Sequence, residues 1–286
     1  MPPLVGTVAK AMSAAGPPQG AKSAPRGAAQ RREPQAWGDH TSPALQISGL
    51  RKVFGGLPAM NGVSLEVMPG ERRLIIGPNG AGKTTLFNLI TGDLVPDAGT
   101  IRLFGEEVSR LKPHQRAHRG VARTYQIITL FPKDSLEHNI VLSLLGLSSV
   151  RWNVFRPLAD ETSLIEEARR VLALVGLDQR AARPISEVSY GERRRVEIAM
   201  ALAQKPKLLL LDEPLAGLSL EERIAVKALI AGIPRSVTVV MIEHDMDTAL
   251  DLAERITVLH YGSVIVEGTR SEVVADPKTH EVYLGS

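Results

Sequence analysis

An eight-residue loop, Gly-Pro-Asn-Gly-Ala-Gly-Lys-Thr at 77–84, constrains the fold of this chain more than any other segment. Its glycines let successive backbone N–H groups turn inward and approach phosphate oxygens closely. A short apolar run at 73–76 precedes the loop, and a helical pattern at 84–91 follows it. A phosphate-binding loop requires this strand–loop–helix context, which an accidental glycine-rich turn would not need.

The loop and the first helical turn supply candidate ligands for a nucleoside triphosphate. Lys83 is expected to reach the β- and γ-phosphates, and the Thr84 hydroxyl is expected to ligate Mg²⁺. The helix that begins near Gly82 adds the partial positive charge of its N-terminus. The candidate nucleotide-binding residues here are Gly77, Pro78, Asn79, Gly80, Ala81, Gly82, Lys83, Thr84 and Thr85. Alone, such a loop is as typical of kinases and GTPases as of ATPases.

Strand and helix patterns alternate through residues 44–286. Apolar alternation and short apolar runs predict strands at 45–47, 63–67, 73–76, 100–103, 207–211, 237–242, 256–259 and 264–266. Helical patterns fall at 84–91, 163–175, 190–203, 219–232 and 245–254. Ser163 and Glu166 match a capping-box signature at the start of the second of these helices. This order predicts an α/β fold with a mostly parallel sheet covered on both faces.

Two acids, Asp212 and Glu213, directly follow the apolar run at 208–211. Open α/β sheets bind ligands at the carboxyl ends of their strands, so these acids are candidates for chemistry rather than a solvated strand end. Asp212 is expected to hold the Mg²⁺ shell, and Glu213 to polarise an attacking water as a general base. The adjacent Glu213 favours a hydrolase, because a kinase must not activate water.

His244 follows the apolar run 237–242 at the same kind of position. We therefore predict a γ-phosphate contact for His244 rather than a purely structural role. Other histidines lack such a context and receive no role: His114, His118, His138, His260 and His280.

The formal charge of +3 belongs to the N-terminal segment. Residues 1–43 hold five Lys and Arg against two acids, so residues 44–286 sum to zero. Rich in Ala, Pro, Gly and Ser, this segment is expected to be a disordered extension, with a basic arm that touches lipid or a partner as the alternative. The positive charge is thus weak evidence for nucleic acid, and no nucleic-acid partner is expected.

The absence of cysteine excludes disulfides, thiolate metal sites and cysteine nucleophiles. No stretch approaches the ~20 apolar residues that span a bilayer, and the N-terminus carries no apolar run of signal-peptide type. We therefore expect a cytoplasmic chain whose link to a membrane, where one exists, comes through a partner.

Four further motifs occur in one characteristic order. Val-Ser-Tyr-Gly-Glu at 188–192 resembles the signature of ABC ATPases, and Gln126 resembles their Q-loop glutamine. Leu-Ala-Gly-Leu-Ser at 215–219 resembles the D-loop, and His244 the switch histidine. With the phosphate loop and the acid pair, this resemblance covers residues 44–286.

The resemblance implies a P-loop ABC ATPase core with an antiparallel β subdomain and an inserted helical subdomain at about 127–200. It implies that two ATPase subunits pair head to tail, with each ATP between the loop of one and the signature of the other. Ser189 and Gly191 would then serve the partner's ATP, and Gln126 would act in catalysis and at Mg²⁺. Phe54 matches the aromatic residue that stacks on adenine, with core packing as its alternative.

Within the family, residues 242–246, 123–126 and 281–285 are most similar to the larger ATPase of branched-chain amino acid importers. This implies integral membrane permease subunits, an indirect link to a substrate-binding protein, and a peripheral place on the cytoplasmic face of the inner membrane. Urea importers, lipopolysaccharide exporters and, more remotely, soluble ABC ATPases or unrelated P-loop kinases are the alternatives. Met200 and Ser219 depart from the Arg and Asp usual in the family.

Overall fold

The computed structural model describes residues 42–125, 130–148, 161–244 and 249–284. Almost all of the segment 1–43 lies outside the described residues, so its expected disorder stays a prediction. Within the described part of the chain, no helix combines the length and apolar character needed to cross a bilayer.

The strands form two sheets. The smaller, antiparallel sheet has the order β2-β1-β4-β5, with β1 (Leu45–Phe54), β2 (Leu57–Val67), β4 (Ala98–Leu103) and β5 (Glu106–Glu107). The larger sheet has the order β10-β9-β3-β8-β7-β6, with β3 (Arg72–Ile76), β6 (Val121–Arg123), β7 (Leu208–Asp212), β8 (Thr238–Ile242), β9 (Arg255–His260) and β10 (Ser263–Gly268). Its pairs are parallel except β9–β10, which confirms the predicted α/β class.

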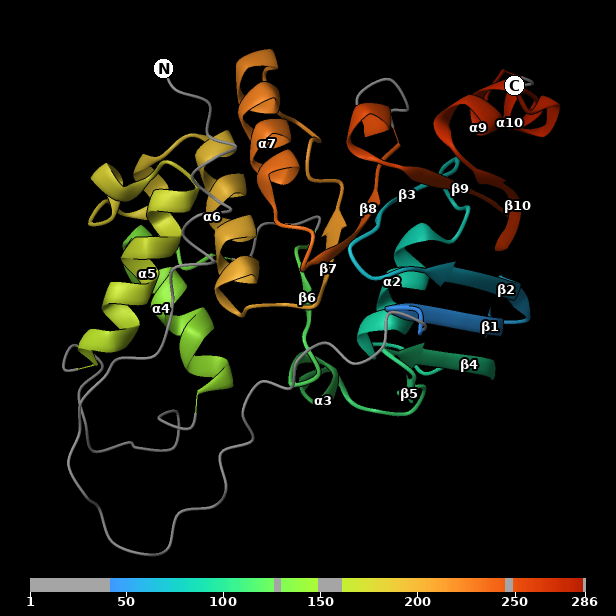
Figure 1. Ribbon diagram of the computed structural model, residues 1–286, viewed down its shortest axis with the longest axis horizontal. Helices are drawn as coiled ribbons and strands as arrows, with labels where there is room; N and C mark the ends of the chain where they lie inside the picture. The colour runs from blue at the N-terminus through green and yellow to red at the C-terminus, as the bar shows by residue number, and fades with distance from the viewer. Residues whose placement is uncertain (1–41, 126–129, 149–160, 245–248, 285–286) are drawn as a thin grey trace, which may run out of the picture.

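The helices gather on different sides of these sheets (Figure 1). They are α2 (Lys83–Thr91), α3 (Pro113–Ala117), α4 (Leu136–Leu147), α5 (Thr162–Leu174), α6 (Tyr190–Ala203), α7 (Leu220–Gly232), α9 (Arg270–Ala275) and α10 (Pro277–Leu284). Short 3-10 turns occur at Asp178–Arg180, Ile185–Glu187 and Leu250–Leu252. Helices α4, α5 and α6 pack on one another at the side of the molecule opposite β1, β2 and β4.

Strand β7, which lies between β8 and the edge strand β6, shows why the larger sheet is buried on both faces. Leu209 and Leu211 pack with apolar residues of α6 and α7, whereas Leu208 and Leu210 pack with those of α2 and the smaller sheet. Successive side chains of a strand point to opposite faces, so a run of four leucines serves both cores. Each fully buried leucine contributes roughly 1.5–3 kcal/mol relative to exposure.

Two local predictions need correction or fall outside the structure. Helix α5 begins at Thr162 after the N-cap Glu161, which makes no side-chain cap, so the capping box of Ser163 was wrong. The carbonyl of Glu161 already accepts from the third and fourth residues after it, which places Ser163 inside the first turn. Of the helix predicted at 245–254, residues 245–248 lie outside the described residues, and the described remainder contains a 3-10 turn.

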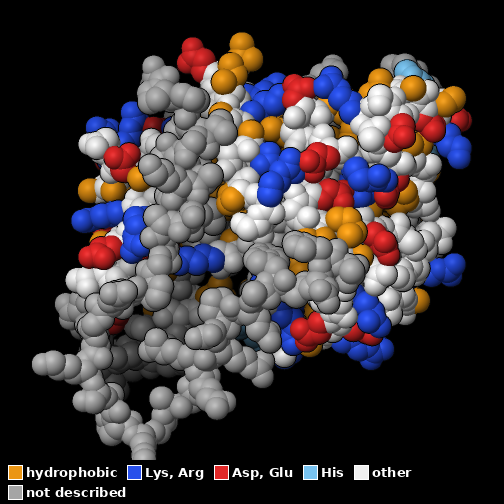
Figure 2. Space-filling model, in the orientation of Figure 1, with side chains coloured by type: hydrophobic (Ala, Val, Ile, Leu, Met, Phe, Trp, Pro, Cys, Tyr) orange, Lys and Arg blue, Asp and Glu red, His pale blue; other side chains and the backbone are white. Residues whose placement is uncertain are grey.

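Charged side chains of both signs share the surface. On the face drawn in Figure 2, Lys and Arg side chains are interspersed with Asp and Glu over the described elements. This agrees with a net charge of zero for residues 44–286, and it does not suggest a basic nucleic-acid surface on that face.

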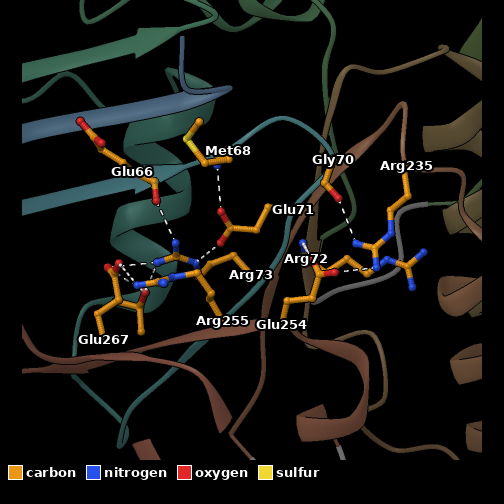
Figure 3. Close-up of polar contacts among 11 residues, drawn as sticks. Glu66, Met68, Gly70, Glu71, Arg72, Arg73, Arg235, Glu254, Arg255 and Glu267 are labelled. Atoms are coloured by element: carbon orange, nitrogen blue, oxygen red, sulfur yellow. Dashed lines mark hydrogen bonds and ion pairs between the residues drawn. The ribbon is translucent and has the colours of Figure 1, made fainter. Parts of the chain in front are cut away.

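Arg73 on β3 ties the two sheets together (Figure 3). Its side chain is almost fully buried and forms ion pairs with Glu71 (2.6 Å) and with Glu267 of β10 (3.0 Å). The same guanidinium donates to the Glu66 carbonyl of β2 at 2.8 Å and to the Thr257 hydroxyl of β9 at 2.9 Å. One buried cation thus links the neighbouring strands β2 and β3 to β9 and β10, which lie far away in the sequence.

Replacing Arg73 with Met should lower the free energy of unfolding by about 3–5 kcal/mol, because the Glu71 side chain, only 9% exposed, would lose its cationic partner. Denaturant titration followed by circular dichroism would measure this loss. Arg102→Met is the control, because the Arg102–Glu107 pair is exposed at 3.9 Å and such pairs contribute about 0–1 kcal/mol. Equal losses for both variants would contradict a linking role for Arg73.

Candidate functional site

The carboxyl ends of three neighbouring parallel strands form one row. In the register of the sheet, Ile75 of β3 pairs with Ile242 of β8, and Ile242 pairs with Asp212 of β7. The loop 77–84 therefore starts beside the positions where the acid pair and His244 leave the sheet. Sequence reasoning placed each motif at a strand end, and the register brings these ends together.

The phosphate loop leads directly into α2, which begins at Lys83. The Lys83 side chain is buried, and its Nζ donates to the carbonyls of Gly77 (2.6 Å) and Pro78 (3.1 Å). Burial lowers the pKa of Lys83, and the carboxylates of Glu213 and Asp212 partly oppose this by favouring the charged ammonium. The ammonium thus lies between the loop and the acid pair.

Two positions of the loop must be glycine because carbonyl oxygens of neighbouring strands approach their Cα atoms closely. A Cβ on Gly77 would overlap the carbonyl oxygen of Leu259 in β9. Gly82, at φ 101°, precedes α2 in the left-handed region, and a Cβ there would lie 2.7 Å from the carbonyl oxygen of Ala59. The loop can therefore pack against β9 and β2 only because these positions lack side chains.

Glu213 is held in a conformation that is unfavourable for a residue with a side chain. Its φ is 46°, which costs of order 1–3 kcal/mol outside glycine. Its N–H donates to the Ile242 carbonyl at 3.0 Å, and the N–H of Leu215 donates to the buried carboxylate of Glu243 at 2.9 Å. Hydrogen bonds to the end of β8 thus impose the turn that directs the chain away after Asp212.

Arg123 connects the acid pair to the phosphate-loop helix. At the end of β6, its guanidinium donates to Asp212 Oδ2 (2.7 Å) and to Asn88 Oδ1 of α2 (2.6 Å). It also lies over the rings of Phe87 and Tyr125, at 5.4 Å and 4.8 Å from their centroids. Asp212 and Arg123 are both nearly buried, so this pair fixes the carboxylate firmly.

The donor chemistry around Asp212 fits a hard divalent cation that shares its ligands with a nucleotide. A threonine hydroxyl at 84 and a carboxylate at 212 are oxygen donors of the kind that Mg²⁺ accepts. In the described ranges, no group of three or more acids, histidines or cysteines could hold a metal by itself. A cation here would therefore draw further oxygens from phosphate, which is typical of Mg²⁺ in nucleotide sites.

The signature residues lie at the N-terminus of α6, whereas the phosphate loop leads into α2. Ser189 is the N-cap of α6: its Oγ accepts from the Glu192 N–H, and the Glu192 carboxylate accepts from the Ser189 N–H. Ser189 is exposed, whereas Gly191 is buried in the first turn. That these residues bind a partner's nucleotide stays a prediction.

The remaining predicted residues are placed as follows. Phe54 is 46% exposed at the end of β1, so core packing is excluded and stacking on adenine stays a prediction. His244 is exposed beyond β8, with Nδ1 4.0 Å from the Glu243 carboxylate. Gln126 lies outside the described residues, directly after Tyr125.

Sequence reasoning missed two residues that contact these groups. Arg123 entered the sequence analysis only within the run 123–126, although an arginine at a strand end is a usable signal for an ion pair with a nearby acid. Glu222, in the first turn of α7, contacts the signature residues; the spacing Ser219-x-x-Glu222 is typical of a helix cap and carries no signal for that contact.

Comparisons with known proteins agree with this fold. The family model described as ABC transporter matches residues 60–216. The chain is 39% identical over 254 residues to the high-affinity branched-chain amino acid transport ATP-binding protein BraF of Pseudomonas aeruginosa, covering 85% of this chain and 98% of that protein. It is 37% identical over 254 residues to LivG of Escherichia coli, a protein of the same description, covering 86% and 99%.

A solved structure supports the fold independently. The ADP conformation of MJ1267, an ATP-binding cassette of an ABC transporter, superposes with a TM-score of 0.77 at 31% identity. The alignment covers 86% of this chain and 100% of that one.

Replacing Gly77 with Ala should weaken ATP binding at least about tenfold, because the new Cβ would push the loop away from the Leu259 carbonyl. Titration with a fluorescent ATP analogue measures the change. Gly80→Ala is the comparison: φ is 80°, but no atom lies within 4 Å of the added Cβ, so only the milder backbone strain applies. Equal affinities for the two variants would contradict this account of the loop.

Proposed function

The chain belongs to the ABC transporter family, and we propose that it is the ATP-hydrolysing subunit of a branched-chain amino acid importer. One observation supports the activity: the phosphate loop, Asp212 and Glu213 follow the carboxyl ends of β3 and β7, two parallel strands with only β8 between them. The substrate class rests on the relatives BraF and LivG, whose descriptions name branched-chain amino acids.

In the proposed reaction, backbone N–H groups of the loop and the Lys83 ammonium bind the β- and γ-phosphates. Thr84 and Asp212 would hold Mg²⁺, which neutralises charge on the phosphate oxygens when bound. Glu213 accepts a proton from the attacking water, and His244 contacts the γ-phosphate from the next strand end. Phe54, exposed on β1, stacks on the adenine.

The proposal includes a second ATPase subunit, identical or related. Ser189 and Gly191 lie at the start of α6, and the loop 77–84 lies at the sheet, so each would complete a site with the other half from its partner. An N-cap serine and the dipole of a 14-residue helix suit the γ-phosphate of a facing nucleotide.

Permease subunits are the proposed route to the membrane. A cavity of about 390 Å³ opens beside the end of β6. It is lined by Arg123, Thr124, Tyr125, Leu130, Ser143, Glu197, Met200, Ala201 and Gln204. Since Arg123 in this wall also holds Asp212, a permease segment seated here would be coupled to the acid pair. The chain would then be peripheral, on the cytoplasmic face.

Replacing Glu213 with Gln should leave ATP binding within about twofold while turnover falls by at least about 10²-fold, because the amide cannot accept the proton of water. Phosphate release measures the turnover, and a fluorescent nucleotide measures the binding. In cells that depend on this subunit, uptake of labelled leucine should fall in parallel.

Glu221→Gln provides the matched control, since this glutamate is exposed on α7. Hydrolysis by the Glu213→Gln variant near the native rate would refute the general-base role. Normal hydrolysis by the native chain, combined with leucine uptake that does not depend on it, would refute the substrate class alone.

A further inference from the structure

The Glu222 carboxylate accepts hydrogen bonds from the signature residues of its own chain. One carboxylate oxygen, Oε1, accepts from the Ser189 hydroxyl and from the Gly191 N–H, both at 2.9 Å. These are the two groups that the proposed function reserves for the γ-phosphate of the partner's ATP. The first turn of α7 thus places the Glu222 carboxylate at the position where the γ-phosphate of the partner's ATP is expected.

The fit around this carboxylate is close. A Cβ on Gly191 would lie 2.5 Å from the Glu222 Cδ and 2.6 Å from Oε1. The absence of a side chain at 191 therefore admits an oxygen directly onto the helix N-terminus. Hydrogen bonds from the Ser219 N–H, the Ser189 hydroxyl and the Gly191 N–H lower the pKa of Glu222, so the carboxylate is charged at neutral pH.

The two donors cannot serve both anions at once. A serine hydroxyl has one proton to donate, and a backbone amide has one. The Ser189 oxygen already accepts from the Glu192 N–H, so its proton is the only donor that it can offer an anion. A phosphate brought within hydrogen-bonding distance would also lie beside the Glu222 carboxylate, and like charges that close repel strongly.

The other oxygen of the same side chain caps α7. Oε2 accepts from the Ser219 N–H at 3.1 Å, and the Glu222 N–H donates to the Ser219 hydroxyl at 3.3 Å. Ser219 ends the segment that resembles the D-loop. A Glu222 side chain that leaves the signature must therefore move while one of its oxygens is tied to this segment.

We propose that Glu222 is a further residue of the nucleotide cycle: it occupies the Ser189–Gly191 anion site in the isolated chain, and the γ-phosphate of the partner's ATP must displace it. This rests on the proposed function, because it assumes that the signature receives a partner's nucleotide. Because Glu222 must be displaced, a higher ATP concentration is needed for the two ATPase subunits to pair. The displaced side chain also couples closure of the shared site to the start of α7.

The test uses the full chain carrying Glu213→Gln, so that bound ATP persists, together with whichever ATPase subunit co-purifies with it. Sedimentation velocity with increasing ATP gives the concentration at half-maximal pairing. Adding Glu222→Ala should lower that concentration by roughly tenfold, because charged hydrogen bonds that compete with phosphate are removed. ADP, which lacks the γ-phosphate, should not induce pairing in either protein.

Two further variants separate this effect from a change in folding. Glu221→Ala removes a neighbouring exposed acid and should leave the ATP dependence unchanged. Glu222→Asp keeps an acid in the first turn of α7 but shortens its reach to Ser189, so it should move pairing in the same direction as Ala. Thermal melting of each variant shows whether the loss of the cap alone changes stability.

An unchanged or higher ATP requirement in both Glu222 variants would overturn the displacement proposal, because Glu222 would then support the signature rather than compete for it. Such a result would leave the proposed function intact, provided that the parent protein with Glu213→Gln alone pairs with ATP and not with ADP. If that parent binds ATP and never pairs, the shared site of the proposed function fails, and this inference fails with it.

Discussion

The parallel register of β3, β8 and β7 is the constraint on which the candidate site depends. Ile75, Ile242 and Asp212 lie in one row, so whatever follows these strands meets at one edge of the sheet. The alternating leucines of β7 maintain that row by packing into a separate core on each face. A shift of one residue would exchange the two faces and remove Asp212 from the loop, which makes burial the source of the site's precision.

Residues with unusually close packing or an unfavourable backbone conformation cluster at this edge of the sheet. Gly77 accommodates a strand carbonyl where a side chain would overlap, and Glu213 takes a positive φ that glycine would adopt more easily. Folding alone does not explain a glutamate at 213. The proposed general-base role would account for it, and a hydrogen bond from the Glu213 N–H to the end of β8 holds the backbone in place.

The elements and motifs could be predicted from the sequence because their signals are local. A short apolar run indicated β7, and α6 was predicted with the bounds that the structure gives it. Contacts between distant residues carry no such signal. Arg123 reaches Asp212 across 89 residues of sequence, and Ser189 reaches Glu222 across 33. The capping box at Ser163 failed for the opposite reason: the pattern was present, but the N-cap lies at Glu161, two residues before Ser163.

In both halves of the proposed shared site, the polar groups already form hydrogen bonds within the chain. Lys83 donates to carbonyls of its own loop, and Ser189 and Gly191 donate to Glu222. Nucleotide binding would therefore exchange one set of hydrogen bonds for another. The net free energy of binding would then be much smaller than the summed energies of the new hydrogen bonds. A cycle that must both close and reopen needs such a small difference, because ATP bound too tightly between two subunits would leave them closed. In the proposed cycle, the internal carboxylate of Glu222 would set that balance on the signature side, and the carbonyls around Lys83 would set it on the other.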